Sequence, residues 1–131
     1  MFLIDSSVYI DTLRQGRDPI HVFSNEFETE LLMTCGIVVC EVLRGIRDPN
    51  IFNRMESFFG LLHPVEFDDT YWADAYNLAW KMDRAGVILP LSDILIASAA
   101  LATNATVVSS DKHFSSIPDL RVQDRISTSQ Q

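Results

Sequence analysis

Four acidic side chains stand out because each lies in an apolar stretch or where a strand is expected to end. They are Asp5, Glu41, Asp93 and Asp111. Carboxylates that converge repel one another, and a fold tolerates such a cluster only when cations neutralise it. Oxygen ligands without a neighbouring cluster of His or Cys select Mg²⁺ or Mn²⁺. One such ion activates water while a second stabilises a leaving oxygen, which is the chemistry of phosphodiester hydrolysis.

Each of these acids, taken singly, also has an ordinary structural explanation. An Asp after a strand or at the start of a helix commonly caps free backbone N–H groups, which applies to Asp5, Asp93 and Asp111. Glu41 has Arg44 one turn away and could form an i,i+3 ion pair with it. However, Glu41 and Asp93 belong to segments apolar enough to be buried, where an unpaired carboxylate is costly. The acids therefore make a stronger case together than separately.

The elements that must position these acids follow from the alternation of short apolar runs with helical patterns. Strands are expected at 2–4, 31–33, 63–67 and 105–109, with an edge strand at 120–122. The first three helices are expected from a serine cap to residue 13, at 19–23, and from a Thr34 cap to about 46. The next is expected at 49–59, where Gly60 ends it. The last two are expected from Asp68 or Asp69 to the residues before Gly86, and at 94–102. This order predicts an α/β protein whose parallel sheet is covered on both faces. Ligands in such sheets bind beyond the carboxyl ends of the strands, where Asp5 and Asp111 should project.

Length and composition limit the domain organisation and location. The 131 residues predict one domain over 1–126, with a flexible tail at 127–131. No apolar run reaches the length of a membrane span, and the first residues lack a basic signal-peptide start, so a cytoplasmic protein is expected. Cys35 and Cys40 are expected to be reduced core thiols. The aromatic residues Trp72, Tyr76 and Trp80 share a helical spacing that favours core or dimer packing over base stacking.

The net charge of −8 has the wrong sign for nonspecific adhesion to nucleic acid. Two bound divalent ions would cancel half of it, which softens the objection without removing it. The same acidity favours association with a basic protein partner through electrostatic steering.

Four segments in this order and at these separations resemble the PIN-domain ribonucleases, in particular the VapC toxins of bacterial toxin–antitoxin pairs. The segments are Leu3-Ile4-Asp5-Ser6-Ser7, Glu41-Val42-Leu43-Arg44-Gly45, Asp93-Ile94-Leu95-Ile96-Ala97-Ser98-Ala99-Ala100 and Val107-Val108-Ser109-Ser110-Asp111-Lys112-His113-Phe114. The resemblance extends from Phe2 to about Val122. The first turn has Asp-Ser-Ser where Asp-Thr-Ser or Asp-Thr-Asn is more usual, a change that leaves the acid untouched.

The resemblance implies a three-layer α/β/α sandwich and a metal site made by the four acids. It implies Mg²⁺- or Mn²⁺-dependent cleavage of RNA, with tRNA or ribosomal RNA as the usual substrate, and a homodimer bound by a VapB-type antitoxin. In the family, a polar residue two positions after the first Asp and a Ser or Thr two before the last help to shape the site. These positions are Ser7 and Ser109 here, and Arg44 is a further candidate for substrate contact.

The sequence argues against two other functions and leaves a third open. A phospho-receiver module needs an acid pair after its first strand, and an aspartate-dependent phosphatase needs Asp-x-Asp there, whereas position 7 is Ser. A PIN-like domain that has become a catalytically silent protein-binding or regulatory module stays open, although all four acids are present. His113 is interpreted as structural rather than as a general base.

Overall fold

The computed structural model describes residues 1–124, so the tail expected at 127–131 lies outside the described residues. Its five strands are β1 (Phe2–Ile4), β2 (Leu32–Cys35), β3 (His63–Val65), β4 (Thr106–Val108) and β5 (Arg121–Gln123). Its α-helices are α1 (Ser6–Arg14), α2 (Pro19–Glu26), α3 (Gly36–Leu43), α4 (Pro49–Leu61), α5 (Asp69–Arg84) and α6 (Leu91–Thr103). Two short 3₁₀ helices, η1 (Thr29–Leu31) and η2 (Lys112–Ser116), complete the described elements.

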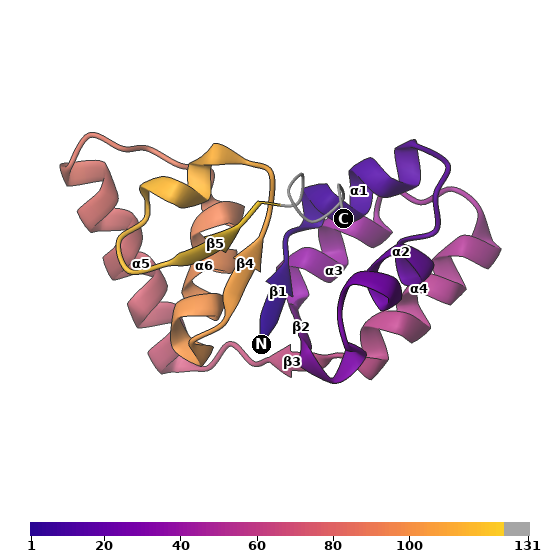
Figure 1. Cartoon of the computed structure of the whole chain (residues 1–131). Helices are drawn as coiled ribbons and strands as arrows, with labels where there is room; N and C mark the ends of the chain where they lie inside the picture. Colours follow the sequence, from indigo (N-terminus) through magenta and orange to yellow (C-terminus); the bar gives the residue numbers. More distant parts are fainter. Residues whose placement is uncertain (125–131) are drawn as a thin grey trace.

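The strands form one parallel sheet in the order β3-β2-β1-β4-β5. Helices α1 to α4 gather on one side of β1 and β2 in Figure 1, and α5 and α6 lie on the other side. The predicted three-layer α/β/α sandwich with a central parallel sheet is confirmed. Because the chain leaves β1 toward β2 and returns to β4 on the opposite side, the carboxyl ends of β1 and β4 form the switch point of the sheet.

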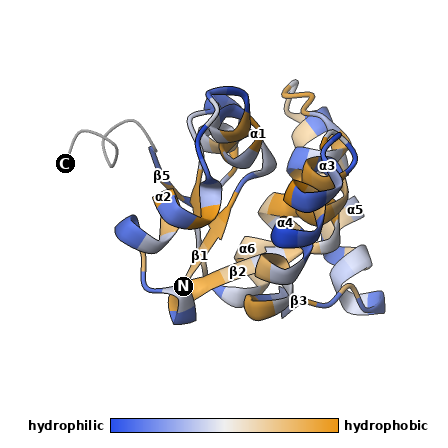
Figure 2. Ribbon diagram, turned by 90° about the vertical axis from the view of Figure 1, so that its right-hand side faces the viewer, coloured by the Kyte–Doolittle hydropathy of each residue, from blue (hydrophilic) through white to orange (hydrophobic). Residues whose placement is uncertain are grey.

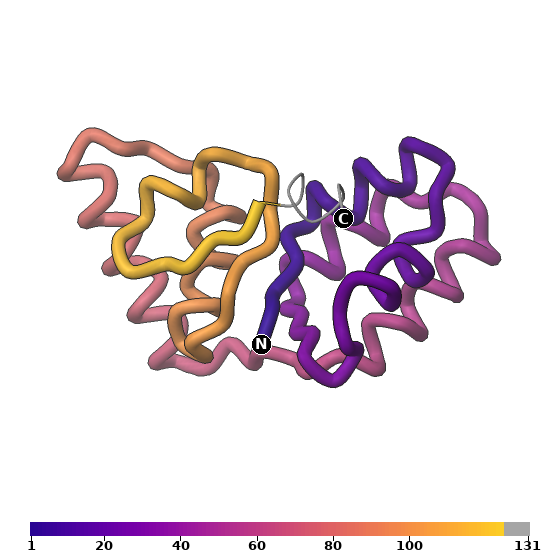
Figure 3. The backbone as a smooth tube through the Cα atoms, viewed as in Figure 1, coloured from indigo at the N-terminus to yellow at the C-terminus, as the bar shows by residue number. Residues whose placement is uncertain are grey.

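Strands β1 and β4 run side by side although about a hundred residues separate them, as the tube in Figure 3 makes visible. Ile4 is paired with Val108, and the backbone N–H of Asp5 donates to the Val108 carbonyl at 3.0 Å. This register brings the residues that follow the two strands to one edge of the sheet.

The hydrophobic core lies between the sheet and the helices, and β1 and β2 have the hydrophobic colour in Figure 2. Leu3, Ile96, Val107 and Phe114 are fully buried there. Helix α6 is buried over Ile94–Ala100, as its nearly uniform apolar sequence predicts. None of the helices within residues 1–124 is long and apolar enough to cross a bilayer.

Several helix boundaries follow the expected capping chemistry. Asp18 and Asp48 cap α2 and α4 through their side chains, each before a Pro at the first turn, and Asp68 caps α5.

Other boundary predictions were wrong. No serine caps α1, since Asp5 holds that position; Thr34 belongs to β2 because the apolar run continues to Cys35; and Gly60 lies inside α4. Strands β3 and β4 are shorter than expected, and β5 begins one residue later.

Two expectations about burial also need correction. Cys35 is a buried free thiol as expected, but Cys40 is exposed because it lies on the outer side of α3. Trp72, Tyr76 and Trp80 lie at the surface of α5 with 44%, 66% and 59% exposure, which excludes core packing and leaves dimer packing as the prediction for them. Arg84 lies 5.1 Å from the centre of the Trp80 ring, which gives that ring a cation–π contact.

Candidate active site at the carboxyl edge of the sheet

Asp5 lies at the switch point and is almost fully buried, with 3% exposure. It occupies the cap position of α1, but its side chain makes no capping hydrogen bond, so the ordinary explanation for an Asp at this place does not apply. Its Oδ2 atom instead accepts hydrogen bonds from Ser7 at 2.5 Å and from Ser109 at 2.9 Å. Within residues 1–124, no Lys, Arg or His forms an ion pair with this carboxylate.

Ser109 joins the ends of β1 and β4. Its hydroxyl donates to Asp5 and accepts the backbone N–H of Asp111 at 2.9 Å. Asp111 lies three residues after Val108, the last residue of β4, and the hydrogen bond to Ser109 fixes the turn that joins Asp111 to the strand. Both polar positions predicted to shape the site, Ser7 and Ser109, contact Asp5.

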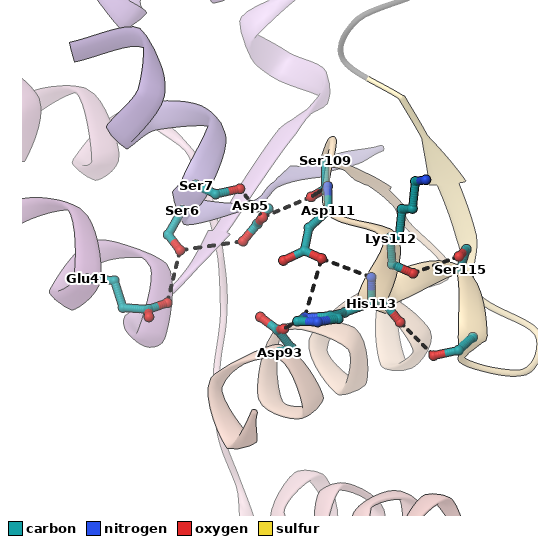
Figure 4. Close-up of polar contacts among 11 residues, drawn as sticks. Asp5, Ser6, Ser7, Glu41, Asp93, Ser109, Asp111, Lys112, His113 and Ser115 are labelled. Atoms are coloured by element: carbon teal, nitrogen blue, oxygen red, sulfur yellow. Dashed lines mark hydrogen bonds and ion pairs between the residues drawn. The ribbon is translucent and has the colours of Figure 1, made fainter. Parts of the chain in front are cut away.

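Glu41 reaches the same edge from the last turn of α3. The Ser6 hydroxyl lies 3.0 Å from Glu41 Oε1 and 3.4 Å from Asp5 Oδ1, so it stands between the two carboxylates (Figure 4). The alternative ion pair between Glu41 and Arg44 is not formed in the described structure. Arg44 is exposed at the end of α3, where it forms the C-cap.

Asp93 and Asp111 face each other on the opposite side of the site, with the His113 ring between them (Figure 4). His113 Nδ1 lies 3.0 Å from Asp93 Oδ2 and 3.3 Å from Asp111 Oδ1. Asp93 makes no capping contact for α6, whereas Asp111 does cap η2 by accepting the backbone N–H of His113. One ligand atom from each of these three residues lies within 4.8 Å of the others, which is compatible with a shared metal ion.

The electrostatics of this group reflect its concentration of negative charge. Burial raises the pKa of the Asp93 carboxyl, the hydrogen bond from His113 opposes that shift, and the charges of Asp5 and Asp111 raise the pKa further. The hydrogen bond to Asp93 and the charge of Asp111 together raise the pKa of the exposed His113 imidazole. The charges of Asp5 and Asp111 thus act on Asp93, although the three acids come from distant sequence positions.

A cavity of about 410 Å³ lies next to Glu41, between α1, α3 and the start of α4. Its lining is mainly apolar, and it also includes Arg14, Arg47 and Glu41. Arg44, the residue predicted to contact substrate, does not line this cavity. Arg14 carried no motif signal, because its place here depends on the packing of α1 against α3.

The residues of the site fit a divalent cation. Asp5 is buried with hydroxyl donors but, in the described part of the chain, without a cationic partner, and Asp93 has an elevated pKa beside two further acids. The donors are hard oxygen atoms with one imidazole, a set that suits Mg²⁺ or Mn²⁺. Sequence reasoning missed Ser6 as the contact between Asp5 and Glu41, and it set His113 aside. The position of His113 two residues after Asp111, in the same turn, was the signal that could have found it.

Comparison with known proteins agrees with this architecture. The family model described as PIN domain matches residues 2–120. A search of curated proteins finds no match to the sequence.

Solved structures of the same fold include two VapBC complexes determined with DNA. The chain of VapBC from Salmonella typhimurium is 21% identical, with a TM-score of 0.78 over 94% of this chain and 96% of that one. The chain of VapBC2 from Rickettsia felis is 20% identical, with a TM-score of 0.77 over 94% and 97%. VapBC-1 from nontypeable Haemophilus influenzae is 19% identical, with a TM-score of 0.74 over 94% and 96%.

Proposed function

This chain belongs to the PIN domain family, and from that premise we propose that it is the toxin of a toxin–antitoxin pair, acting as a Mg²⁺- or Mn²⁺-dependent endoribonuclease. The observation that carries the proposal is the convergence of buried Asp5 with Asp93 and Asp111 at the switch point of the sheet, without an ion pair to Asp5 from residues 1–124. A catalytic site that must neutralise phosphate charge needs such a cation-binding pocket.

Asp5, Glu41, Asp93 and Asp111 would hold the metal in this proposal. When bound, the divalent ion supplies positive charge that offsets the carboxylates and polarises the scissile phosphodiester. Ser7 and Ser109 hold the Asp5 carboxylate in one orientation through hydrogen bonds to Oδ2. The burial of Asp5 excludes bulk water from one side of the pocket, which strengthens the interaction between its charge and a cation.

The proposed substrate is RNA, with tRNA or ribosomal RNA as the candidates, and cleavage would leave 5′-phosphate and 3′-hydroxyl ends and inhibit translation. These substrates place the activity in the cytoplasm. Arg44 is exposed at the end of α3, near Glu41 in sequence, and we assign it a contact with substrate phosphate.

The proposed protein partner is a VapB-type antitoxin. Solved complexes that share the fold include VapBC pairs, and the net charge of −8 favours a basic binding segment. We also propose a homodimer. The exposed aromatic residues of α5 are candidates for its contact, since an exposed apolar patch of this kind is typical of an interface.

The test is an RNA cleavage assay with total tRNA and ribosomal RNA, comparing Mg²⁺ or Mn²⁺ with EDTA. Asp5→Asn and Asp93→Asn should each abolish metal-dependent cleavage while circular dichroism shows an intact fold. Asp83→Asn, an exposed acid near the end of α5, serves as the matched control and should cut like the wild type. Full activity in both site variants would refute the assignment.

A catalytically silent PIN-like binding module is the alternative function. It shares the fold and the partner but has no need for a divalent ion. A protein that binds an antitoxin with high affinity, yet neither binds Mn²⁺ nor cuts RNA, would favour that alternative.

A further inference from the structure

Ser6 connects two carboxylates that the fold brings from different elements. It is the first residue of α1, directly after Asp5, and its side chain is buried with 7% exposure. Its Oγ atom lies 3.0 Å from Glu41 Oε1 and 3.4 Å from Asp5 Oδ1. The hydroxyl has one proton to donate, and the shorter distance assigns that proton to Glu41.

The two carboxylates depend on Ser6 to different degrees. Asp5 keeps hydrogen bonds from Ser7 and Ser109 even when the Ser6 contact is removed. Among the described residues, Ser6 is the only side chain that gives Glu41 a hydrogen bond, and no Lys or Arg there forms an ion pair with it. Glu41 is long and rotates about several bonds, so without Ser6 its carboxylate would sample several positions.

We propose that Ser6 is a positioning residue that fixes the Glu41 carboxylate of α3 against Asp5, and that it thereby sets the cation affinity of the site. This inference rests on the proposed function, because it assigns Ser6 a part in the same metal pocket. A group that orients a ligand contributes to affinity without touching the ion, and loss of such a partner typically weakens binding by 10- to 100-fold. The hydroxyl of Ser6 therefore acts through Glu41.

The experiment measures the Kd of Mn²⁺ by isothermal titration calorimetry for the wild-type protein and for Ser6→Ala, with the fold checked by circular dichroism. Ser6→Ala should bind Mn²⁺ about 10-fold more weakly. Ser6→Thr, which retains the hydroxyl, should recover most of the affinity. Ser98→Ala is the matched control, since Ser98 is a buried helical serine with 4% exposure whose hydroxyl has no hydrogen-bond partner within residues 1–124, and it should bind Mn²⁺ like the wild type.

A double-mutant cycle with Glu41→Ala separates positioning from a general structural effect. If Ser6 acts through Glu41, Ser6→Ala should cause no further loss of Mn²⁺ affinity in the Glu41→Ala background. The same loss in both backgrounds, or wild-type affinity in folded Ser6→Ala, would overturn the role of Ser6 while leaving the proposed function standing. A wild-type protein that neither binds Mn²⁺ nor cuts RNA would overturn both.

Discussion

Addition of Mn²⁺ should stabilise the folded protein strongly, because the site exists only in the folded state. Its carboxylates come from positions 5, 41, 93 and 111, so the unfolded chain has no comparable pocket. A ligand that binds only the folded state adds RT ln(1 + [L]/Kd), or about 2.7 kcal/mol at 100 times Kd. For 131 residues, about 4 °C of Tm corresponds to 1 kcal/mol, so the Tm should rise by about 10 °C.

Thermal unfolding followed by circular dichroism, with MnCl₂ against EDTA at matched ionic strength, measures this rise in Tm, called the Mn²⁺ increment below. Asp93→Asn should lose most of it, because Asp93 faces both Asp111 and His113. Asp74→Asn, an exposed acid on α5, should keep all of it. The reasoning is refuted if Mn²⁺ leaves the wild-type Tm unchanged, or if Asp93→Asn shows the full increment.

The pH dependence of the Mn²⁺ increment follows from the raised pKa of Asp93, which is caused mainly by burial and further by Asp5 and Asp111. In the metal-free protein, a raised carboxyl pKa favours the folded state at low pH. That contribution is complete below the unfolded pKa of about 3.9 and is lost as the pH rises through the folded pKa. Mn²⁺ requires the deprotonated carboxylate. The increment should therefore grow from pH 4 to pH 7, and a decrease over this range would contradict the assignment.

Three further predictions concern single residues. The hydrogen bond to Asp93 and the charge of Asp111 raise the pKa of His113, which adds to the free energy of unfolding of the metal-free protein below about pH 6.5. This stability is lost as the pH rises through the raised pKa. His113→Ala should flatten the loss in unfolding curves from pH 5.5 to 8.5, and an unchanged dependence of stability on pH would count against the prediction. Phe114→Ala removes a fully buried ring and should lower the free energy of unfolding in urea by about 3–5 kcal/mol; a loss below about 1 kcal/mol would show that the ring packs less tightly than described. Arg44→Ala should leave stability within about 0.5 kcal/mol of the wild type, raise the KM for RNA and reduce its salt dependence, whereas an unchanged salt dependence would exclude a phosphate contact.

The central strands could be predicted from the sequence because each is a short apolar run that ends at polar residues. The run before Asp5 gives β1 its bounds, and the parallel sheet follows from the alternation with helices. The start of α3 was misplaced because Thr34 is a common cap, whereas here its backbone continues the buried strand to Cys35. Gly60 predicts a helix end, yet α4 continues through it to Leu61.

The contacts within the site depend on packing that a sequence pattern does not contain. The resemblance to the PIN-domain ribonucleases identified Ser7, two positions after Asp5, as a residue that helps to shape the site. The contact of Ser6 with Glu41 arises only because α1 packs on α3, and no spacing rule links residues 35 positions apart. Helical periodicity likewise gave the aromatic stripe of α5, including Trp80, but could not say whether it faces the core or the surface.

Anomalous diffraction from a crystal soaked in Mn²⁺ tests the central claim most directly. The claim predicts a Mn²⁺ peak among the carboxylates of Asp5, Glu41, Asp93 and Asp111, and its loss in Asp5→Asn crystals. The claim would be contradicted if fully occupied Mn²⁺ were found only elsewhere on the protein. It would also be contradicted if no Mn²⁺ peak appeared at concentrations that support RNA cleavage.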